Sequence, residues 1–195
     1  MNLIKPAKRQ VADQFETERL VIRRYQTTDI EALYAAARES IEEVSRFLPW
    51  CHPDYSIAES KQWVTLVIKN WGVSNLFSFV IEEKSSRRFI GSVGINAVDL
   101  HPMVNLGYWL RSSETGKGYA IEAAQGIIDW TFAELQSQRI EIILSVENNP
   151  SKKVAEKTGA RHEGILASRL LLHGRLHDAH LFALTRDSRL DQHST

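Results

Sequence analysis

The segment Thr115-Gly116-Lys117-Gly118-Tyr119-Ala120 carries the residue types best suited to binding an anion. Two glycines separated by one residue let the backbone turn sharply with several N–H groups pointing the same way. The segment also stands directly before a run with helical periodicity, and the N-terminus of a helix attracts negative charge through its dipole. The pattern therefore predicts a cradle for a pyrophosphate group.

Two commoner phosphate-binding loops do not match this segment. A Walker A loop requires Ser or Thr after the Gly-Lys pair, but Lys117 is followed by Gly118, so no hydroxyl is placed for magnesium. A dinucleotide fingerprint requires a third glycine, at the position where Ile121 stands. A nucleotide-binding module that uses this loop remains an alternative, but the sequence argues against it.

The runs on either side of the loop predict the elements that position it. Val104 to Leu110 is apolar and typical of a strand, and Ala120 to Leu135 carries apolar residues at helical spacing. Ile140 to Val146 is short and β-branched, as in a buried strand. Because a helix separates the two strands, we expect them to be parallel neighbours.

The remaining chain predicts further elements around this centre. Thr28-x-x-Glu31 and Ser56-x-x-Glu59 match the capping box, which marks the start of a helix. The first helix should run to about Arg38, and the second should pack one face on the core through Trp63, Leu66, Val67 and Trp71. Strands are expected at Arg19 to Tyr25, Leu76 to Ile81 and Phe89 to Ile95, a short helix after Asn149-Pro150, and a closing hairpin of Gly164 to Leu172 and Leu176 to Leu184 that turns at His173-Gly174.

Length and composition are those of a single domain. The chain has 195 residues, of which 43% are hydrophobic, and we expect an extension at 1–14, one domain at 15–187 and a tail at 188–195. Lys plus Arg equal Asp plus Glu at 24 each, so no overall field favours nucleic acid or a membrane surface. The single Cys51 fits a small buried hydrophobe in a reducing compartment, and the cytoplasm is the expected location.

The predicted order of elements resembles the GNAT N-acetyltransferase superfamily, and is most similar to its RimJ/RimL type. This resemblance implies an α+β (mixed α/β) fold, with a twisted, mostly antiparallel sheet of about six or seven strands, a splayed parallel pair and flanking helices. The residues that carry it are Glu18-Arg19-Leu20, Leu48-Pro49-Trp50, Leu106-Gly107-Tyr108-Trp109-Leu110, the glycine loop with Glu122-Ala123, Asn148-x-x-Ser151, Lys157-Thr158-Gly159-Ala160 and Glu163-Gly164. Thr115 departs from the Gln or Arg with which the superfamily usually begins this loop.

The resemblance implies that acetyl-CoA is the co-substrate. Its pantetheine arm would lie between the two central strands, bonded to the backbone of Tyr108, Trp109 and Leu110. Its pyrophosphate would be held by Thr115, Gly116, Lys117, Gly118, Tyr119 and Ala120. Asn148 would contact the cofactor arm, although a turn-forming role before Pro150 is the alternative.

The catalytic residues are less clearly indicated by the family pattern. Ala155 stands where many members carry a tyrosine that protonates the departing thiolate, which leaves Ser151 as the candidate beside the sulfur, with helix capping as its alternative. Glu163 matches a glutamate considered as the base for the acceptor amine, but a carboxylate that orders loops is an equal alternative. The uncertain acid and base keep open an acyl-CoA binding or sensing protein without turnover.

The acceptor is expected to be a protein N-terminal α-amine or a small-molecule amine that attacks directly in a ternary complex. Trp50 and His52 lie where the family places the acceptor pocket, and Trp50 can alternatively anchor its loop to the core. No metal is expected, because the spacing of His177 and His180 within a strand puts them on opposite faces, and His173 precedes that strand. No nucleic acid or membrane partner is expected, and a homodimer is allowed.

Overall fold

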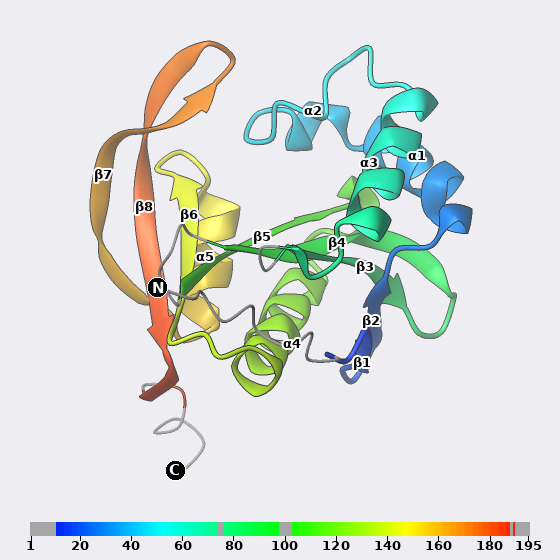
Figure 1. Cartoon of the computed structure of the whole chain (residues 1–195). Coiled ribbons are helices and arrows are strands. Elements are labelled where there is room, and N and C mark those ends of the chain that lie inside the picture. Colours follow the sequence, from blue (N-terminus) through cyan, green and yellow to red (C-terminus); the bar gives the residue numbers. More distant parts are fainter. Residues whose placement is uncertain (1–10, 74–75, 98–102, 188, 190–195) are drawn as a thin grey trace, which may run out of the picture.

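A computed structural model describes residues 11–73, 76–97, 103–187 and 189. Residues 1–10 and 190–195, most of the anticipated extension and tail, lie outside the described residues. The elements are β1 (Gln14–Glu16), β2 (Leu20–Arg24), α1 (Ile30–Glu39), α2 (Ile41–Val44), α3 (Ile57–Lys69), β3 (Phe77–Glu83), β4 (Arg88–Ala97), β5 (Met103–Leu110), α4 (Tyr119–Glu134), β6 (Arg139–Ser145), α5 (Asn149–Lys157), β7 (Arg161–Leu172) and β8 (Arg175–Thr185) (Figure 1).

One mixed sheet runs through the whole molecule. Its eight strands follow the order β1-β2-β3-β4-β5-β6-β8-β7, and every neighbouring pair is antiparallel except β5 and β6. The mixed α/β class and the parallel central pair are therefore confirmed. The sheet has one strand more than the sequence indicated, because β1 has only three residues and shows no periodicity of its own.

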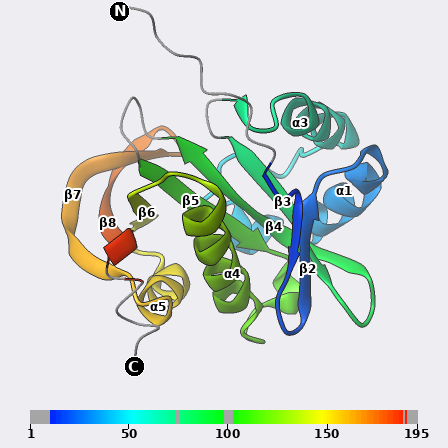
Figure 2. The same ribbon diagram turned by 60° about the horizontal axis from the view of Figure 1, so that its bottom comes forward.

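Helices cover both faces of the sheet. Helix α4 packs on one face and helices α1 and α3 on the other (Figure 2). The first face is the larger core, where Ala123, Ala124, Ile127 and Ile128 of α4 are fully buried against β2 to β6. Their spacing is the one read from the sequence, and the alanines near the start of α4 let helix and sheet approach closely. Among the described residues, no helix has the length and apolar character needed to cross a bilayer.

The predicted start of the first helix is wrong. The capping box is formed by Gln26 and Asp29, not by Thr28 and Glu31, and it opens a short 3₁₀ turn that leads into α1. Asp29 is nearly buried and accepts hydrogen bonds from both Arg23 Nη atoms, at 2.9 and 2.8 Å. The need of this buried carboxylate for partners sets the start of the turn.

The predicted core face of α3 is also partly wrong. The Ser56 and Glu59 capping box is present, but Trp63 and Leu66 are 40% and 46% exposed. The buried side chains of α3 are Ser60, Val64 and Val67, one row around the helix from the predicted stripe. Trp71 packs against the core from beyond the end of the helix. Trp63 instead lines a cavity described below.

The parallel strands β5 and β6 pair only at their first residues. Met103, Val104 and Asn105 face Arg139, Ile140 and Glu141, and no register is formed beyond them. Strand β6 then pairs with β8 along its whole length, so the sheet opens between β5 and β6. From Leu106 to Leu110, the edge of β5 that faces β6 is left without a partner strand.

Candidate active site

The glycine turn stands at the end of β5 and opens α4. Gly116 and Gly118 have φ angles of +75° and +86°, in the left-handed region that glycine adopts without cost, and Gly118 is the N-cap of α4. The N–H groups of Gly116, Lys117 and Gly118 meet no acceptor among the described residues. A Cβ atom at Gly116 would meet nothing within 4 Å, so the turn faces open space. These unpaired donors fit an anion such as pyrophosphate.

Arg19 holds the turn from behind. Its Nη1 donates to the carbonyl oxygen of Lys117 at 3.0 Å, and its guanidinium lies 4.5 Å from the centre of the Tyr119 ring. In a planar trans peptide the C=O and the following N–H point in opposite directions, so the N–H of Gly118 points away from Arg19. Arg19 thereby fixes the direction of a donor that it does not itself touch.

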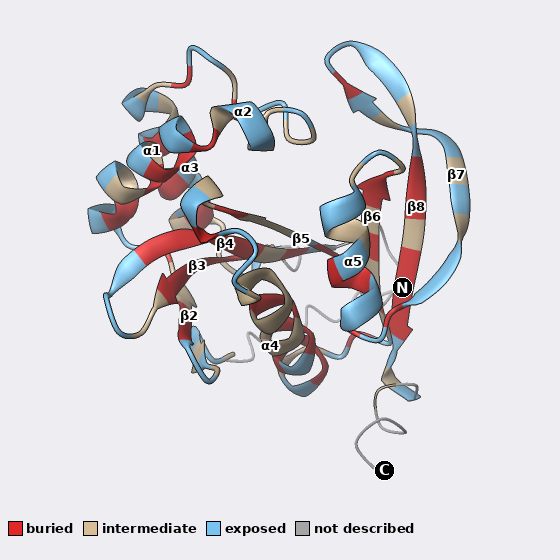
Figure 3. Cartoon of the chain, turned by 180° about the vertical axis from the view of Figure 1, so that it is seen from behind, coloured by how far each residue is buried: buried red, intermediate tan, exposed pale blue. Residues whose placement is uncertain are grey.

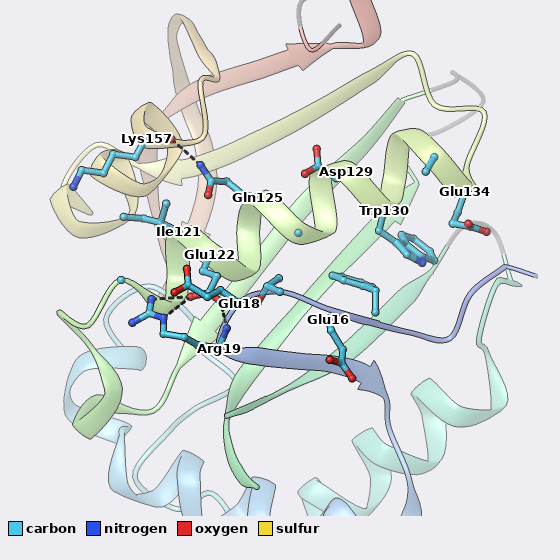
Figure 4. A pocket seen from close by; sticks show the side chains of 15 residues that line it. Glu16, Glu18, Arg19, Ile121, Glu122, Gln125, Asp129, Trp130, Glu134 and Lys157 are labelled. Carbon is cyan, nitrogen blue, oxygen red and sulfur yellow. Dashed lines mark hydrogen bonds and ion pairs between the residues drawn. The ribbon is translucent and has the colours of Figure 1, made fainter. Parts of the chain in front are cut away.

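Glu122, in the first turn of α4, holds Arg19 in this position. It accepts from Arg19 Nε at 2.7 Å, from the Arg19 backbone at 2.7 Å and from Thr17 Oγ1 at 2.6 Å (Figure 4). Partial burial would raise the pKa of Glu122, but the hydrogen bonds from Thr17 and Arg19 outweigh it and leave that pKa below its usual value. In the sequence, Arg19 and Glu122 belong only to the family pattern, because a contact between residues 103 positions apart leaves no local signal.

The side chains of the turn are occupied by their own neighbours. Lys117 Nζ contacts Glu114 Oε2 at 2.9 Å, and Thr115 Oγ1 donates to Ser112 O at 2.9 Å. Glu114 is nearly buried and also pairs with Arg88. The free hydrogen-bonding groups of the turn are therefore those of the backbone, as the glycines indicated.

The phenol of Tyr108, on β5, lies near Ser151 at the start of α5. Its hydroxyl oxygen is buried and has no hydrogen-bond partner, although its side chain belongs to the edge of the main core. Burial raises the pKa of Tyr108 to about 12, and the nearby Ser151 hydroxyl lowers it slightly without reaching hydrogen-bond geometry. A buried hydroxyl without a partner is costly, so this atom fits a site that a ligand completes.

Asn148 and Ser151 stand at the start of α5, at the open end of β6. Asn148 is the N-cap, and its Oδ1 accepts from the Ser151 backbone N–H at 3.1 Å. The capping role weighed for Ser151 thus belongs to Asn148, while the Ser151 side chain lies beside Tyr108. Ala155 is buried on the same helix and offers no acidic hydrogen.

Glu163 lies at the other end of β6, where β5 and β6 are paired. Arg139 donates to both of its carboxylate oxygens, with Nη1 at 3.0 Å from Oε1, and Arg161 lies at 3.5 Å. Hydrogen bonding to Arg139 lowers the pKa of Glu163. These contacts hold the Glu163 carboxylate at the paired end of β6, and none of them involves Ser151 or the glycine turn.

A cavity of about 410 Å³ lies on the α1 and α3 side of the sheet. Trp50 and His52, the two residues expected at an acceptor pocket, both line this cavity, and Trp109 of β5 forms part of its wall. Trp50 packs edge to face on Trp109 and on Tyr55, with centroids 5.3 and 5.6 Å apart, so it both anchors its loop and lines the cavity. The other lining residues are Leu33, Leu48, Tyr55, Glu59, Trp63, Ser78, Ser92, Gly94, Asn96, Gly107 and Tyr108.

Two of the three histidines at and after the hairpin turn, His173 and His180, have different partners. His173 contacts Ser45 O at 2.8 Å, whereas His180 lies under α5 and contacts His162 at 3.0 Å. In the part of the chain that the structure describes, no three His, Cys, Asp or Glu side chains gather as metal ligands. Cys51 is fully buried, and burial raises its pKa to about 11, so the interpretation as a small hydrophobe is confirmed.

The sequence matches a known protein family and several of its members. Residues 19–161 match the model described as Acetyltransferase (GNAT) domain. The chain is 30% identical over 173 residues to an uncharacterized N-acetyltransferase, p20, of Bacillus licheniformis, covering 87% of this chain and 94% of that protein.

Solved structures agree. RimJ of Mycobacterium smegmatis in complex with a CoA disulfide superposes with a TM-score of 0.79 at 25% identity, covering 86% of this chain and 82% of that one. RimL, a ribosomal-protein N-acetyltransferase in complex with coenzyme A, shares the fold with a TM-score of 0.80 at 21% identity, covering 88% and 97% of the two chains. The chain therefore belongs to the GNAT family of N-acetyltransferases.

Proposed function

We propose that the protein transfers the acetyl group of acetyl-CoA to a primary amine by direct attack in a ternary complex. The observation that carries this proposal is the opening of the sheet between β5 and β6, with an unpaired strand edge ending at a glycine turn. An extended pantetheine arm can pair with such an edge as an added strand would. Relatives in complex with coenzyme A support the same choice of ligand.

The residues proposed to hold acetyl-CoA lie along one path. The backbone of Tyr108, Trp109 and Leu110 offers the free edge of β5, and the turn from Thr115 to Ala120 offers its unpaired N–H groups to the pyrophosphate. Asn148 shapes the start of α5 at the open end of β6. Acetyl-CoA supplies the activated acyl group, and the chain supplies orientation and hydrogen-bond donors.

Ser151 and Tyr108 are proposed to serve the leaving thiolate. The thiol has a pKa of about 8.5 by analogy with cysteine, so at neutral pH the thiolate needs stabilisation more than immediate protonation. Two hydroxyl groups beside each other, one buried without a partner, can donate hydrogen bonds to a sulfur placed between the strands. This arrangement replaces the tyrosine that the family pattern places at Ala155.

Release of free CoA thiol tests the proposal directly. Purified protein with acetyl-CoA is offered 2-phenylethylamine, spermidine and a short peptide with a free N-terminus, and products are identified by mass spectrometry. We expect amine-dependent thiol release with at least one acceptor and an acetylated product of matching mass. Tight acetyl-CoA binding by calorimetry with no turnover on any amine would instead support the acyl-CoA sensing protein, which Ala155 keeps as the second candidate.

A further inference from the structure

His52 and Glu59 form a pair in the wall of the cavity. His52 Nε2 lies 2.8 Å from Glu59 Oε1, and both side chains line the cavity. Glu59 Oε2 accepts from the Ser56 backbone N–H at 2.9 Å and from Ser56 Oγ at 2.8 Å. The capping box that starts α3 therefore holds the carboxylate in place, and the carboxylate in turn orients the imidazole.

The protonation of this pair follows from its partners. Hydrogen bonds from Ser56 and then His52 lower the pKa of Glu59, so the carboxylate is ionised at neutral pH and can only accept. Whenever the His52 ring is neutral, its contact with this carboxylate requires the hydrogen to be on Nε2, which leaves the lone pair on Nδ1. No donor among the described residues contacts Nδ1. His52 is thus a free proton acceptor with a fixed tautomer.

Among the described residues, the ring of His52 contacts the Glu59 carboxylate and the Tyr55 ring. The Tyr55 ring meets it edge to face with centroids 6.2 Å apart, and burial raises the pKa of Tyr55, so the phenol stays neutral. Arg38 donates to the carbonyl of Pro53, next to His52 in the chain. Glu59 is the one carboxylate bonded to the ring among the described residues.

The cavity links this pair to the strand that is proposed to hold the thioester. Its walls run from His52 and Glu59 to Tyr108 and Trp109 on β5, within about 410 Å³. On the floor, Gly107 carries no side chain, and a Cβ atom there would meet nothing within 4 Å. A compact amine in this cavity can therefore contact both His52 and the part of β5 that is proposed to hold the thioester. Glu163, in contrast, is bound by Arg139 and does not line the cavity.

We propose that His52, oriented by Glu59, removes the proton from the acceptor amine, a step that rests on the acetyl transfer proposed above. A proton passes from the ammonium to Nδ1 of neutral His52, and the imidazolium is stabilised by the Glu59 carboxylate. The free amine forms the C–N bond to the acyl carbon as the C–S bond breaks, and the electron pair of that bond leaves with the sulfur. The proton on His52 then goes to solvent. The extra proton on the newly acylated nitrogen passes to the thiolate, so the products are the amide and the CoA thiol.

The test compares His52→Gln with Glu59→Gln, with Glu163→Gln, and with His177→Gln, the same change at a histidine outside the cavity. Rates are measured from pH 6 to pH 9 on the best acceptor among 2-phenylethylamine, spermidine and the peptide. We expect His52→Gln to lower kcat at pH 7 by about 100-fold or more, with the deficit shrinking as the amine deprotonates by itself at high pH. Acetyl-CoA affinity and melting temperature should stay at wild-type values, as should all parameters of His177→Gln.

Glu59→Gln keeps a capping side chain but loses the negative charge. We expect Glu59→Gln to lower kcat by about 10-fold. In the double variant with His52→Gln, kcat should be no lower than in His52→Gln alone, because the two residues act as a unit. Parallel pH profiles for wild type and His52→Gln would overturn the inference. So would a pH profile that changes shape at low pH in Glu163→Gln but not in His52→Gln. Absence of turnover by the wild type on all three amines would overturn the proposed acetyl transfer itself, so the two failures are distinguishable.

Discussion

At the scale of single residues, Tyr108 combines a ring packed in the core with a hydroxyl group available to a ligand. Its ring packs with the core, but its hydroxyl is buried without a partner beside Ser151. Leaving a buried hydroxyl unpaired costs about 1–3 kcal/mol, which a purely structural position would avoid with phenylalanine. Tyr108 therefore connects packing to the proposed chemistry of the thiolate.

Removing these hydroxyls should affect turnover more than folding. We expect Ser151→Ala and Tyr108→Phe each to lower kcat by about 10 to 100-fold, or about 1.4 to 2.7 kcal/mol, with acetyl-CoA affinity nearly unchanged. Tyr108→Phe should raise the melting temperature slightly, because it removes a buried unpaired group. Steady-state kinetics beside thermal unfolding measure both effects, and unchanged kcat in both variants would contradict a role at the sulfur.

The glycine turn allows a test in which only charge differs. Gly118 has φ +86°, so any side chain there costs about 1–2 kcal/mol, with Asn and Asp tolerated best. A Cβ atom at Gly118 would lie 3.3 Å from Arg19 Nη2. We expect Gly118→Asp to weaken acetyl-CoA binding by about tenfold more than Gly118→Asn, because only the aspartate adds a negative charge beside the anion site and competes with the Lys117 carbonyl for Arg19. Calorimetry on both folded variants measures the difference. Equal affinities would place the pyrophosphate elsewhere.

At the scale of elements, the site is a junction between β5, α4 and the segment before β2. Arg19 reaches from that segment to the carbonyl of Lys117, and Glu122 of α4 holds Arg19 in place. A helix N-terminus and a strand edge are general features, but their relative direction here depends on this long-range pair. The orientation of the backbone donors is therefore a property of three elements together.

Removing the Arg19 side chain should weaken acetyl-CoA binding, because Arg19 fixes the direction of the glycine turn. We expect Arg19→Ala to raise the Kd for acetyl-CoA by about tenfold, or about 1.4 kcal/mol, with the exposed Arg175→Ala as a matched control that changes nothing. Glu122 has a lowered pKa, so its contribution is complete above its unfolded pKa of about 4.3 and is lost only as pH falls through the lower folded value. The difference in Kd should accordingly be constant from pH 6 to pH 8. A wild-type Kd in Arg19→Ala would show that the turn holds its direction unaided.

At the scale of the whole molecule, the tip of the β7–β8 hairpin contacts the end of helix α2. The hairpin of β7 and β8 projects from the sheet with an exposed outer face (Figure 3). At its tip, His173 Nε2 donates to Ser45 O at 2.8 Å, across 128 residues of sequence. This contact links the hairpin to the end of α2, on the side of the molecule that carries His52.

His173→Asn should release the tip of the β7–β8 hairpin from the end of α2 without changing the hairpin turn. His173 and Gly174 have φ angles of +50° and +75°, as in a type I′ turn, where Asn-Gly is strongly preferred. Asparagine keeps the turn, while its shorter side chain loses the contact with Ser45. We expect faster amide exchange at the hairpin tip and in α2 together, with a stability loss of about 0.5–1.5 kcal/mol at most. Unchanged amide exchange in α2 would show that the contact does not couple the hairpin tip to α2.

The sequence determined the local features of this protein. The capping box at Ser56, the helical stripe of α4, the β-branched run of β6 and the turn at His173-Gly174 all appear as their patterns indicated. Each depends on residues within one or two turns of one another, where propensity and periodicity act directly. The glycine turn was equally readable, because positive φ angles at Gly116 and Gly118 are a local requirement.

Only the tertiary structure decided which distant groups meet. Arg19 with Glu122, Tyr108 with Ser151, and Arg139 with Glu163 are each brought together by strand order and by the opening of the sheet. The same packing buries Val64 in place of Trp63, which faces the cavity with His52 and Glu59. No local pattern encodes these pairs, because a side chain's partner across the sheet depends on the register of every strand between them.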